Sequence, residues 1–71
     1  MLCKENLTYL IGNPVGIAFN NGTGTSGVLR DIKDNILYLI EYLYQKQFAT
    51  KHYDLNTIKY VNPFPALPQD K

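Results

Sequence analysis

The residues that could do chemistry in this chain are few and widely spaced. Cys3 and His52 are the only cysteine and the only histidine among its 71 residues. An internal disulfide needs two cysteines, and a zinc site needs several Cys or His ligands at short spacing. No nucleophile stands beside a base, and no two acids are paired in a pattern typical of an active site. We therefore expect a non-enzymatic protein without metal or cofactor, with His52 at a strand surface or core edge.

Glu41 is the one charged residue inside the most apolar part of the chain, residues 36–43. A carboxylate buried there would have a raised pKa, which can indicate a functional group. The more common arrangement is a pairing with a neighbouring lysine or with a backbone group at an interface. We favour the pairing.

Gly22, Gly24 and Gly27 have the spacing of a dinucleotide-binding loop. Such a loop must be followed by a helix and by an acidic residue further along the chain, and both are missing. A hairpin whose second strand is twisted explains these glycines better.

The composition is that of one small globular domain. Hydrophobic residues make up 45% of the chain, charged residues 18%, and the net charge is +1. The low charge argues against a general polyanion binder. A domain of this size has marginal stability, so packing and oligomerisation must supply what disulfides and metals do not. No signal-peptide pattern and no membrane-length apolar run is visible, and the single cysteine fits a reducing compartment, so we expect a cytoplasmic location.

The first half of the chain predicts one short helix and two strands. Residues 4–11 have helical spacing, with Gly12 and Pro14 ending the helix. Residues 15–19 alternate as a strand, and the Asn-Gly pair at 21–22 is typical of a hairpin turn. A second strand follows through residue 32, and residues 33–35 form a polar turn.

Residues 36–53 are ambiguous. A helix with Asp34 as its N-cap would place Ile36, Ile40 and Leu43 on one face. The abundance of Ile and Tyr and the apolar residues on every side favour two strands instead, with a turn at residues 45–47. The first of these strands would be buried on both faces.

The last part of the chain predicts a one-turn connector at residues 54–57 and a final strand at 58–61. The sum is a mainly all-β fold: a five-stranded, strongly bent antiparallel barrel with a short N-terminal helix. Residues 1–62 would form this single domain, and residues 63–71 a proline-rich tail. The minimal PxxP at residues 65–68 lacks a flanking arginine, so we interpret it as part of that tail.

The strand and turn pattern resembles a known family. The run 15–22, the four residues after it, the segment 27–29, Ile32 and the strand at 36–39 resemble the first Sm motif. Sm, LSm and Hfq proteins share this motif, and other SH3-like small barrels fit the same pattern. The resemblance implies a small barrel that joins edge strands into rings and, in most members, binds RNA.

The RNA pocket of that family is not matched. Lys33 stands where the family usually has an aspartate, and Leu37 stands at the place of the uridine-contacting asparagine. Aligned on Ile58, the Arg-Gly or Lys-His pair of the second motif falls on residues 54–56, and the Lys51-His52 pair comes too early. The resemblance therefore implies the scaffold rather than the usual RNA contact.

Six tyrosines are the most distinctive feature of the composition. They could stack the bases of single-stranded nucleic acid, or they could pack across strands and at a protein interface. We favour a self-associating binding or assembly module. Its partner would be a second copy or another protein, and we expect no membrane partner. The expected self-association face is Leu37, Leu39, Tyr42, Leu43 and Tyr44. The alternative is an Sm-like RNA-binding protein with contacts from Lys51, Tyr53, Lys59 and Tyr60.

Overall fold

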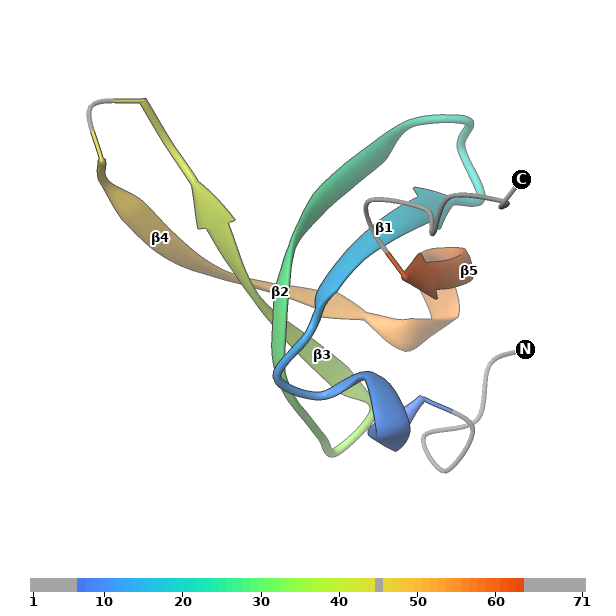
Figure 1. Ribbon diagram of the computed structural model, residues 1–71. Coiled ribbons are helices and arrows are strands. Elements are labelled where there is room, and N and C mark those ends of the chain that lie inside the picture. The colour runs from blue at the N-terminus through green and yellow to red at the C-terminus, as the bar shows by residue number, and fades with distance from the viewer. Residues whose placement is uncertain (1–6, 45, 64–71) are drawn as a thin grey trace, which may run out of the picture.

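The computed structural model describes residues 7–44 and 46–63, and this part of the chain forms one antiparallel sheet of five strands (Figure 1). The order across the sheet is β4-β3-β2-β1-β5. The strands are β1 (Pro14–Phe19), β2 (Gly24–Lys33), β3 (Ile36–Tyr42), β4 (Phe48–Asp54) and β5 (Ile58–Pro63). Two short 3-10 helices, η2 (Thr8–Leu10) and η3 (Leu55–Thr57), precede β1 and join β4 to β5. The predicted all-β class, the strands and the connector at residues 54–57 are confirmed.

Turn chemistry sets where the hairpins reverse. Gly22 has a φ of 91°, a backbone conformation that suits glycine and closes the β1–β2 turn. Asp34 and Asn35 have φ values of 54° and 66°, which belong to the type I′ turn that suits a two-residue hairpin. The turns predicted at residues 20–22 and 33–35 are therefore confirmed.

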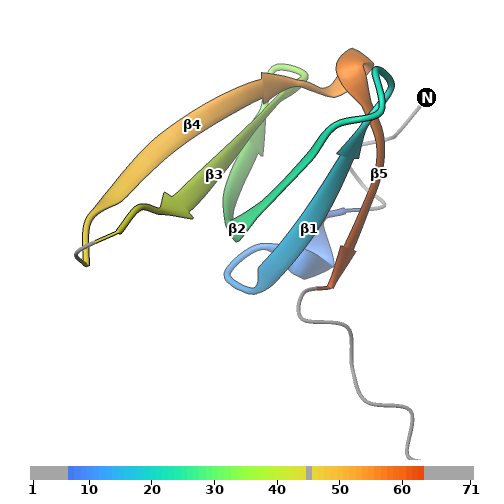
Figure 2. The ribbon, with the colours of Figure 1, turned by 90° about the horizontal axis from the view of Figure 1, so that it is seen from above.

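The sheet is strongly bent because β2 belongs to both of its halves. The first part of β2 pairs with β1 from Gly24 to Val28, and the second part pairs with β3 as far as Lys33. The β2–β3 register shifts between Leu29 and Asp31, and a β-bulge of this kind bends and twists a strand. As a result the β3–β4 hairpin extends away from the other strands (Figures 1 and 2).

The predicted closure into a barrel is not found. Closure would require β4 to pair with β5, but these strands lie at opposite edges of the sheet order. Among the described strands, β4 and β5 therefore have a single neighbour each. The physical reason is the course of β4, which follows β3 from Asp54 opposite Ile36 to Phe48 opposite Tyr42 and so runs into the hairpin that extends away from β5 (Figures 1 and 2).

The predicted N-terminal helix is seen only as the 3-10 turn η2 within the described residues; residues 4–6 of that prediction lie outside them. The backbone N–H groups of Leu10, Ile11 and Asn13 each donate to the carbonyl three residues earlier. Gly12 then has a φ of 92°, so it ends the turn as expected.

The core lies on the inner face of the bent sheet. Eleven hydrophobic side chains are buried there: Leu7, Leu10, Val15, Ile17, Leu29, Ile32, Leu37, Leu39, Leu55, Ile58 and Val61. No polar or charged residue is buried among the described residues. Leu37 and Leu39 have no exposed surface, which removes them from the predicted self-association face. The opposite face of β3 is half-covered at Ile36, Tyr38 and Ile40.

The predicted boundary between the domain and the tail, after residue 62, falls within β5. Pro63 is the last residue of β5 and lies opposite Val15 of β1, so the final strand extends two residues beyond its predicted end. The rest of the predicted tail, residues 64–71, with the minimal PxxP at 65–68, falls outside the described part of the chain. Within the described residues, the structure contains no helix with the length and apolarity to cross a membrane.

Candidate binding surfaces

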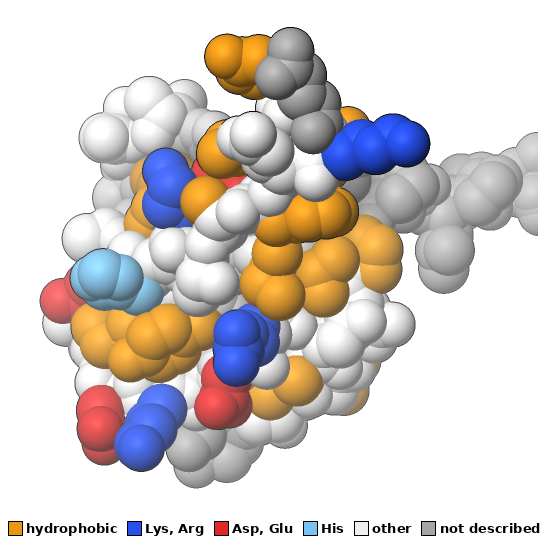
Figure 3. All heavy atoms as spheres, turned by 90° about the vertical axis from the view of Figure 1, so that its left-hand side faces the viewer, with side chains coloured by type: hydrophobic (Ala, Val, Ile, Leu, Met, Phe, Trp, Pro, Cys, Tyr) orange, Lys and Arg blue, Asp and Glu red, His pale blue; other side chains and the backbone are white. Residues whose placement is uncertain are grey.

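The end of the β3–β4 hairpin carries a group of large hydrophobic side chains in contact with solvent. The exposed fractions are 61% for Tyr42, 39% for Leu43, 78% for Tyr44 and 65% for Phe48. We call these four residues the hairpin surface. The Tyr42 and Phe48 rings meet edge to face across the two strands, with centroids 5.3 Å apart. Hydrophobic side chains gather in patches on the side of the molecule shown in Figure 3, with Lys and Arg side chains around them.

Local hydrogen bonds hold the hairpin surface in place. The backbone N–H of Leu43 donates to the carbonyl of Gln47 at 2.7 Å, which continues the β3–β4 pairing beyond Tyr42. The Tyr42 hydroxyl accepts from the backbone N–H of Lys46 at 3.2 Å. The exposed rings of Tyr42 and Phe48 are therefore carried on paired strands.

A hollow on the outer face of the sheet adjoins the hairpin surface and shares Tyr42 and Phe48 with it. Its volume is about 320 Å³, and no charged side chain lines it. The lining residues are Pro14, Ser26, Gly27, Val28, Ile40, Tyr42 and Phe48. The apolar surface therefore continues from the hairpin onto β2 and β1.

The predicted self-association face is thus divided between two places. Tyr42, Leu43 and Tyr44 lie on the hairpin surface, whereas Leu37 and Leu39 belong to the core. Phe48 was missed by the sequence reasoning. The signal that could have found it is cross-strand pairing: the predicted turn at residues 45–47 would place Phe48 opposite Tyr44, and the observed register places it opposite Tyr42.

The residues of the RNA alternative do not gather on one strand pair. Lys51 and Tyr53 lie on β4, and Lys59 and Tyr60 lie on β5, at opposite edges of the sheet. Both lysines and Tyr60 are exposed, whereas Tyr53 is half-buried. Tyr53 and Tyr60 also line two separate cavities.

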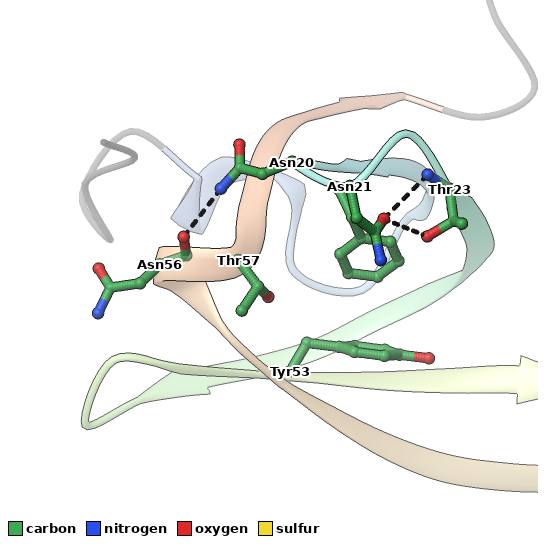
Figure 4. Close-up of a pocket in the computed structure, with 7 residues that line it drawn as sticks. Asn20, Asn21, Thr23, Tyr53, Asn56 and Thr57 are labelled. Carbon is green, nitrogen blue, oxygen red and sulfur yellow. Dashed lines mark hydrogen bonds between the residues drawn. The ribbon is translucent and has the colours of Figure 1, made fainter.

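A second concave site lies at the other end of β4, between the β1–β2 turn and η3 (Figure 4). We call it the amide pocket because three asparagines are among the residues that line it. Its volume is about 490 Å³. The lining residues are Phe19, Asn20, Asn21, Thr23, Tyr53, Asn56 and Thr57. The sequence reasoning took the asparagines only as turn formers.

Hydrogen bonds order the rim of the amide pocket. Asn20 Nδ2 donates to the backbone carbonyl of Asn56 at 3.0 Å, which ties the β1–β2 turn to η3. Asn21 Oδ1 accepts from Thr23 twice, from the backbone N–H at 3.0 Å and from the hydroxyl at 2.6 Å. The Asp54 side chain caps η3 by accepting from the backbone N–H of Asn56 at 2.8 Å. These hydrogen bonds hold the β1–β2 turn and η3 together at the rim.

Tyr53 is the aromatic base of the amide pocket. Its hydroxyl donates to Glu41 Oε2, and the same oxygen accepts from the Thr25 hydroxyl at 3.1 Å. Burial of the phenol, together with the hydrogen bond to Glu41 and the negative charge of that residue, raises the pKa of Tyr53 to about 12. The partners of Glu41 are thus two hydroxyls, where the sequence favoured a lysine or a backbone group.

The remaining chemical candidates are dispersed. His52 is exposed on β4 and lies beside Tyr38, with ring centroids 6.3 Å apart. Across residues 7–44 and 46–63, no three His, Cys, Asp or Glu side chains form a group that could hold a metal ion. Cys3 lies outside these ranges.

Comparison with known proteins adds nothing to these surfaces. The chain has no significant match among protein families, curated proteins or solved structures.

Proposed function

We propose that this chain is a non-enzymatic binding or assembly module of the Sm-like or SH3-like type, and that it self-associates through the hairpin surface. The observation that carries the proposal is the exposure of Tyr42, Leu43, Tyr44 and Phe48 together on one hairpin. Contiguous apolar side chains on a small protein typically mark an interaction site. Tyrosine and phenylalanine are also the residue types enriched in protein interfaces.

The open edges of the sheet support the same proposal. β4 carries part of the hairpin surface and has one neighbour, and β5 has one neighbour at the opposite edge. An edge strand offers unpaired backbone groups to another strand. We propose that β4 of one copy pairs with β5 of the next, so that the barrel-like closure missing within one chain is completed between chains. A cytoplasmic location is part of this proposal.

The test is the mass of the protein in solution, measured by light scattering over a wide range of concentration. We expect the wild-type protein to form a defined oligomer. Leu43→Lys and Tyr44→Lys place a charge in the apolar contact and should yield monomers. A wild-type protein that stays monomeric at the highest concentration would contradict the proposal.

Tyr9→Lys is the matched control. Tyr9 is 71% exposed and belongs to η2, which lies away from the hairpin in Figure 1. This variant should keep the mass of the wild type. If Tyr9→Lys dissociates the oligomer while the hairpin variants leave it intact, the interface lies elsewhere.

A further inference from the structure

The β1–β2 turn holds Asn21, the only asparagine of the chain that a glycine follows. An asparagine side chain can react with the backbone nitrogen of the next residue, and a side chain on that next residue hinders the approach. The nitrogens after Asn13 and Asn62 belong to prolines and carry no hydrogen. The other asparagines precede Leu7, Asn21, Ile36 and Thr57, whose side chains are all larger than a hydrogen atom. Asn21 is therefore the asparagine best placed to react with its own backbone.

The surroundings of the turn leave this reaction open. Residues 20–24 are exposed, and nothing lies within 4 Å of the place where a Cβ of Gly22 would stand. Water therefore reaches both the Asn21 amide and the Gly22 nitrogen. The backbone N–H of Gly22 donates to the carbonyl of Phe19 at 3.1 Å, so this one hydrogen bond must open before the nitrogen can react.

Thr23 places two donors on the Asn21 carbonyl oxygen. Oδ1 accepts from the backbone N–H of Thr23 at 3.0 Å and from its hydroxyl at 2.6 Å, as the dashed lines in Figure 4 show. An attack on Cγ of Asn21 moves negative charge onto this same oxygen. Two donors aimed at the atom where charge develops are the arrangement of an oxyanion hole. Thr23 therefore stabilises the intermediate of such an attack.

We propose that Asn21-Gly22 is a site of spontaneous deamidation, assisted by the two donors of Thr23. The Gly22 nitrogen forms a bond to Cγ of Asn21 and loses its proton to water, while the electron pair of the Cγ–Oδ1 double bond moves onto Oδ1. The intermediate then breaks the Cγ–Nδ2 bond, and Nδ2 takes up a proton and leaves as ammonia. The attack is favoured because nucleophile and carbonyl belong to adjacent residues.

The cyclic imide that results is opened by water at either of its carbonyls. One opening gives aspartate at position 21, and the other gives isoaspartate, in which the main chain runs through the former side chain. Both place a carboxylate in the amide pocket, whose lining residues carry no charged side chain. Isoaspartate also lengthens the main chain within the turn, where the backbone N–H of Phe19 donates to the carbonyl of Thr23 at 2.8 Å. The modification therefore changes both the charge of the pocket and the geometry of its rim.

The test follows the folded full chain during incubation at neutral and at mildly alkaline pH. Peptide mass spectrometry measures the replacement of an amide NH2 by OH at each asparagine, and chromatography separates the aspartate and isoaspartate products. Asn21 should be converted before any other asparagine. Its rate should rise with pH, because the Gly22 nitrogen must lose its proton.

Two matched variants test the role of Thr23. Thr23→Val removes the hydroxyl and keeps the backbone N–H and the branched shape. It should slow conversion by about threefold to tenfold, less than for a buried oxyanion donor, because the turn is exposed to water. Thr23→Ser keeps the hydroxyl and should react at the rate of the wild type. In urea the three proteins should react alike, because unfolding removes the contacts to Asn21 Oδ1.

The proposal is overturned if Asn21 stays intact, or if another asparagine is converted as fast. These results concern the wild type alone and hold even if Thr23→Val does not fold. A folded Thr23→Val that reacts as fast as the wild type, or faster, would also overturn it, because the contacts of Thr23 would then not assist the reaction. Conversion of Asn21 in a protein that proves monomeric would leave this proposal intact and remove only the proposed self-association.

Discussion

The two ends of the β3 region have almost the same composition and opposite environments. Leu37 and Leu39 have no exposed surface, whereas Leu43, at the same alternation along the chain, is 39% exposed, and Tyr42 and Tyr44 are 61% and 78% exposed. Both ends belong to one apolar segment of the sequence, which only Glu41 interrupts. The difference lies in what covers each end: the first faces the core on the inner side of the sheet, and the second continues into the projecting hairpin. Hydrophobic character alone does not decide burial; the course of the neighbouring strands does.

The largest expected effect comes from truncating the buried end. Leu39→Ala leaves a cavity in a closely packed core, and we expect the free energy of unfolding to fall by about 2–5 kcal/mol. Leu43→Ala, at the 39% exposed position, should lower it by less than about 1 kcal/mol. Both values are measured by urea denaturation. The protein concentration is chosen so that the wild type and both variants have the same oligomeric state. Equal losses would abolish the distinction between the two ends.

A smaller effect on stability is expected at Gly27, where the backbone of β2 lies close to β3. A Cβ at Gly27 would be nearest to the backbone carbonyl of Ile40 and would lie 3.0 Å from Cγ of Leu39. The backbone cannot give way cheaply, so Gly27→Ala should reduce stability by about 1–3 kcal/mol. Ser26→Ala changes the exposed neighbouring position and should have little effect on the denaturation midpoint. A Gly27→Ala variant as stable as the wild type would mean that there is room for a methyl group between Gly27 of β2 and Ile40 of β3.

Substitutions in the corner that joins β4 to β5 should reduce stability still less. Asp54 caps η3 and also accepts from Asn35 Nδ2 at 3.3 Å, so Asp54→Ala should cost about 1 kcal/mol in thermal or urea unfolding. Asp54→Asn keeps an acceptor for the N–H of Asn56 and should recover most of that loss. If Asp54→Asn is as unstable as Asp54→Ala, the loss of the η3 cap is not the cause of the lower stability.

A final effect appears only at high pH and tests how Tyr53 is held. Its pKa is raised from 10.0 to about 12, so the folded protein holds this proton more tightly than the unfolded chain does. The resulting stabilisation is complete below about pH 10 and is lost as the pH rises toward 12. Tyr53→Phe removes this contribution, so its stability should fall less than that of the wild type over this range, as measured by urea denaturation at several pH values. Parallel curves for the two proteins would mean that Tyr53 does not interact with Glu41 in this way.

The parts of the fold that could be predicted are those that depend on neighbouring residues. The β1–β2 turn follows from Asn21-Gly22, and the type I′ turn at Asp34-Asn35 follows from residues that tolerate positive φ. The alternation of Leu37 and Leu39 correctly indicated one common face of a strand, but it could not say that this face is the core. That answer depends on long-range packing against residues such as Leu29 and Ile32.

The candidate sites were harder to predict for the same reason. The amide pocket combines the β1–β2 turn, the end of β4 and η3, which are distant in sequence. Asn20 and Asn56 looked like separate turn residues, and only the folded chain brings Asn20 Nδ2 to the carbonyl of Asn56. The hairpin surface was predicted in three of its four residues because Tyr42, Leu43 and Tyr44 follow one another along the chain.

The pairing of β1 with β5 has a consequence for how this chain folds. Every other strand pair joins neighbours in the sequence, whereas β1 and β5 are the first and last strands of the sheet. Neighbouring strands close short loops, but the β1–β5 pair must close a loop that contains three strands, which costs more chain entropy and slows folding. We therefore expect the hairpins from β1 to β4 to form early and β5 to dock late. The Asn20–Asn56 contact and the amide pocket would then be among the last features to assemble and the first to open.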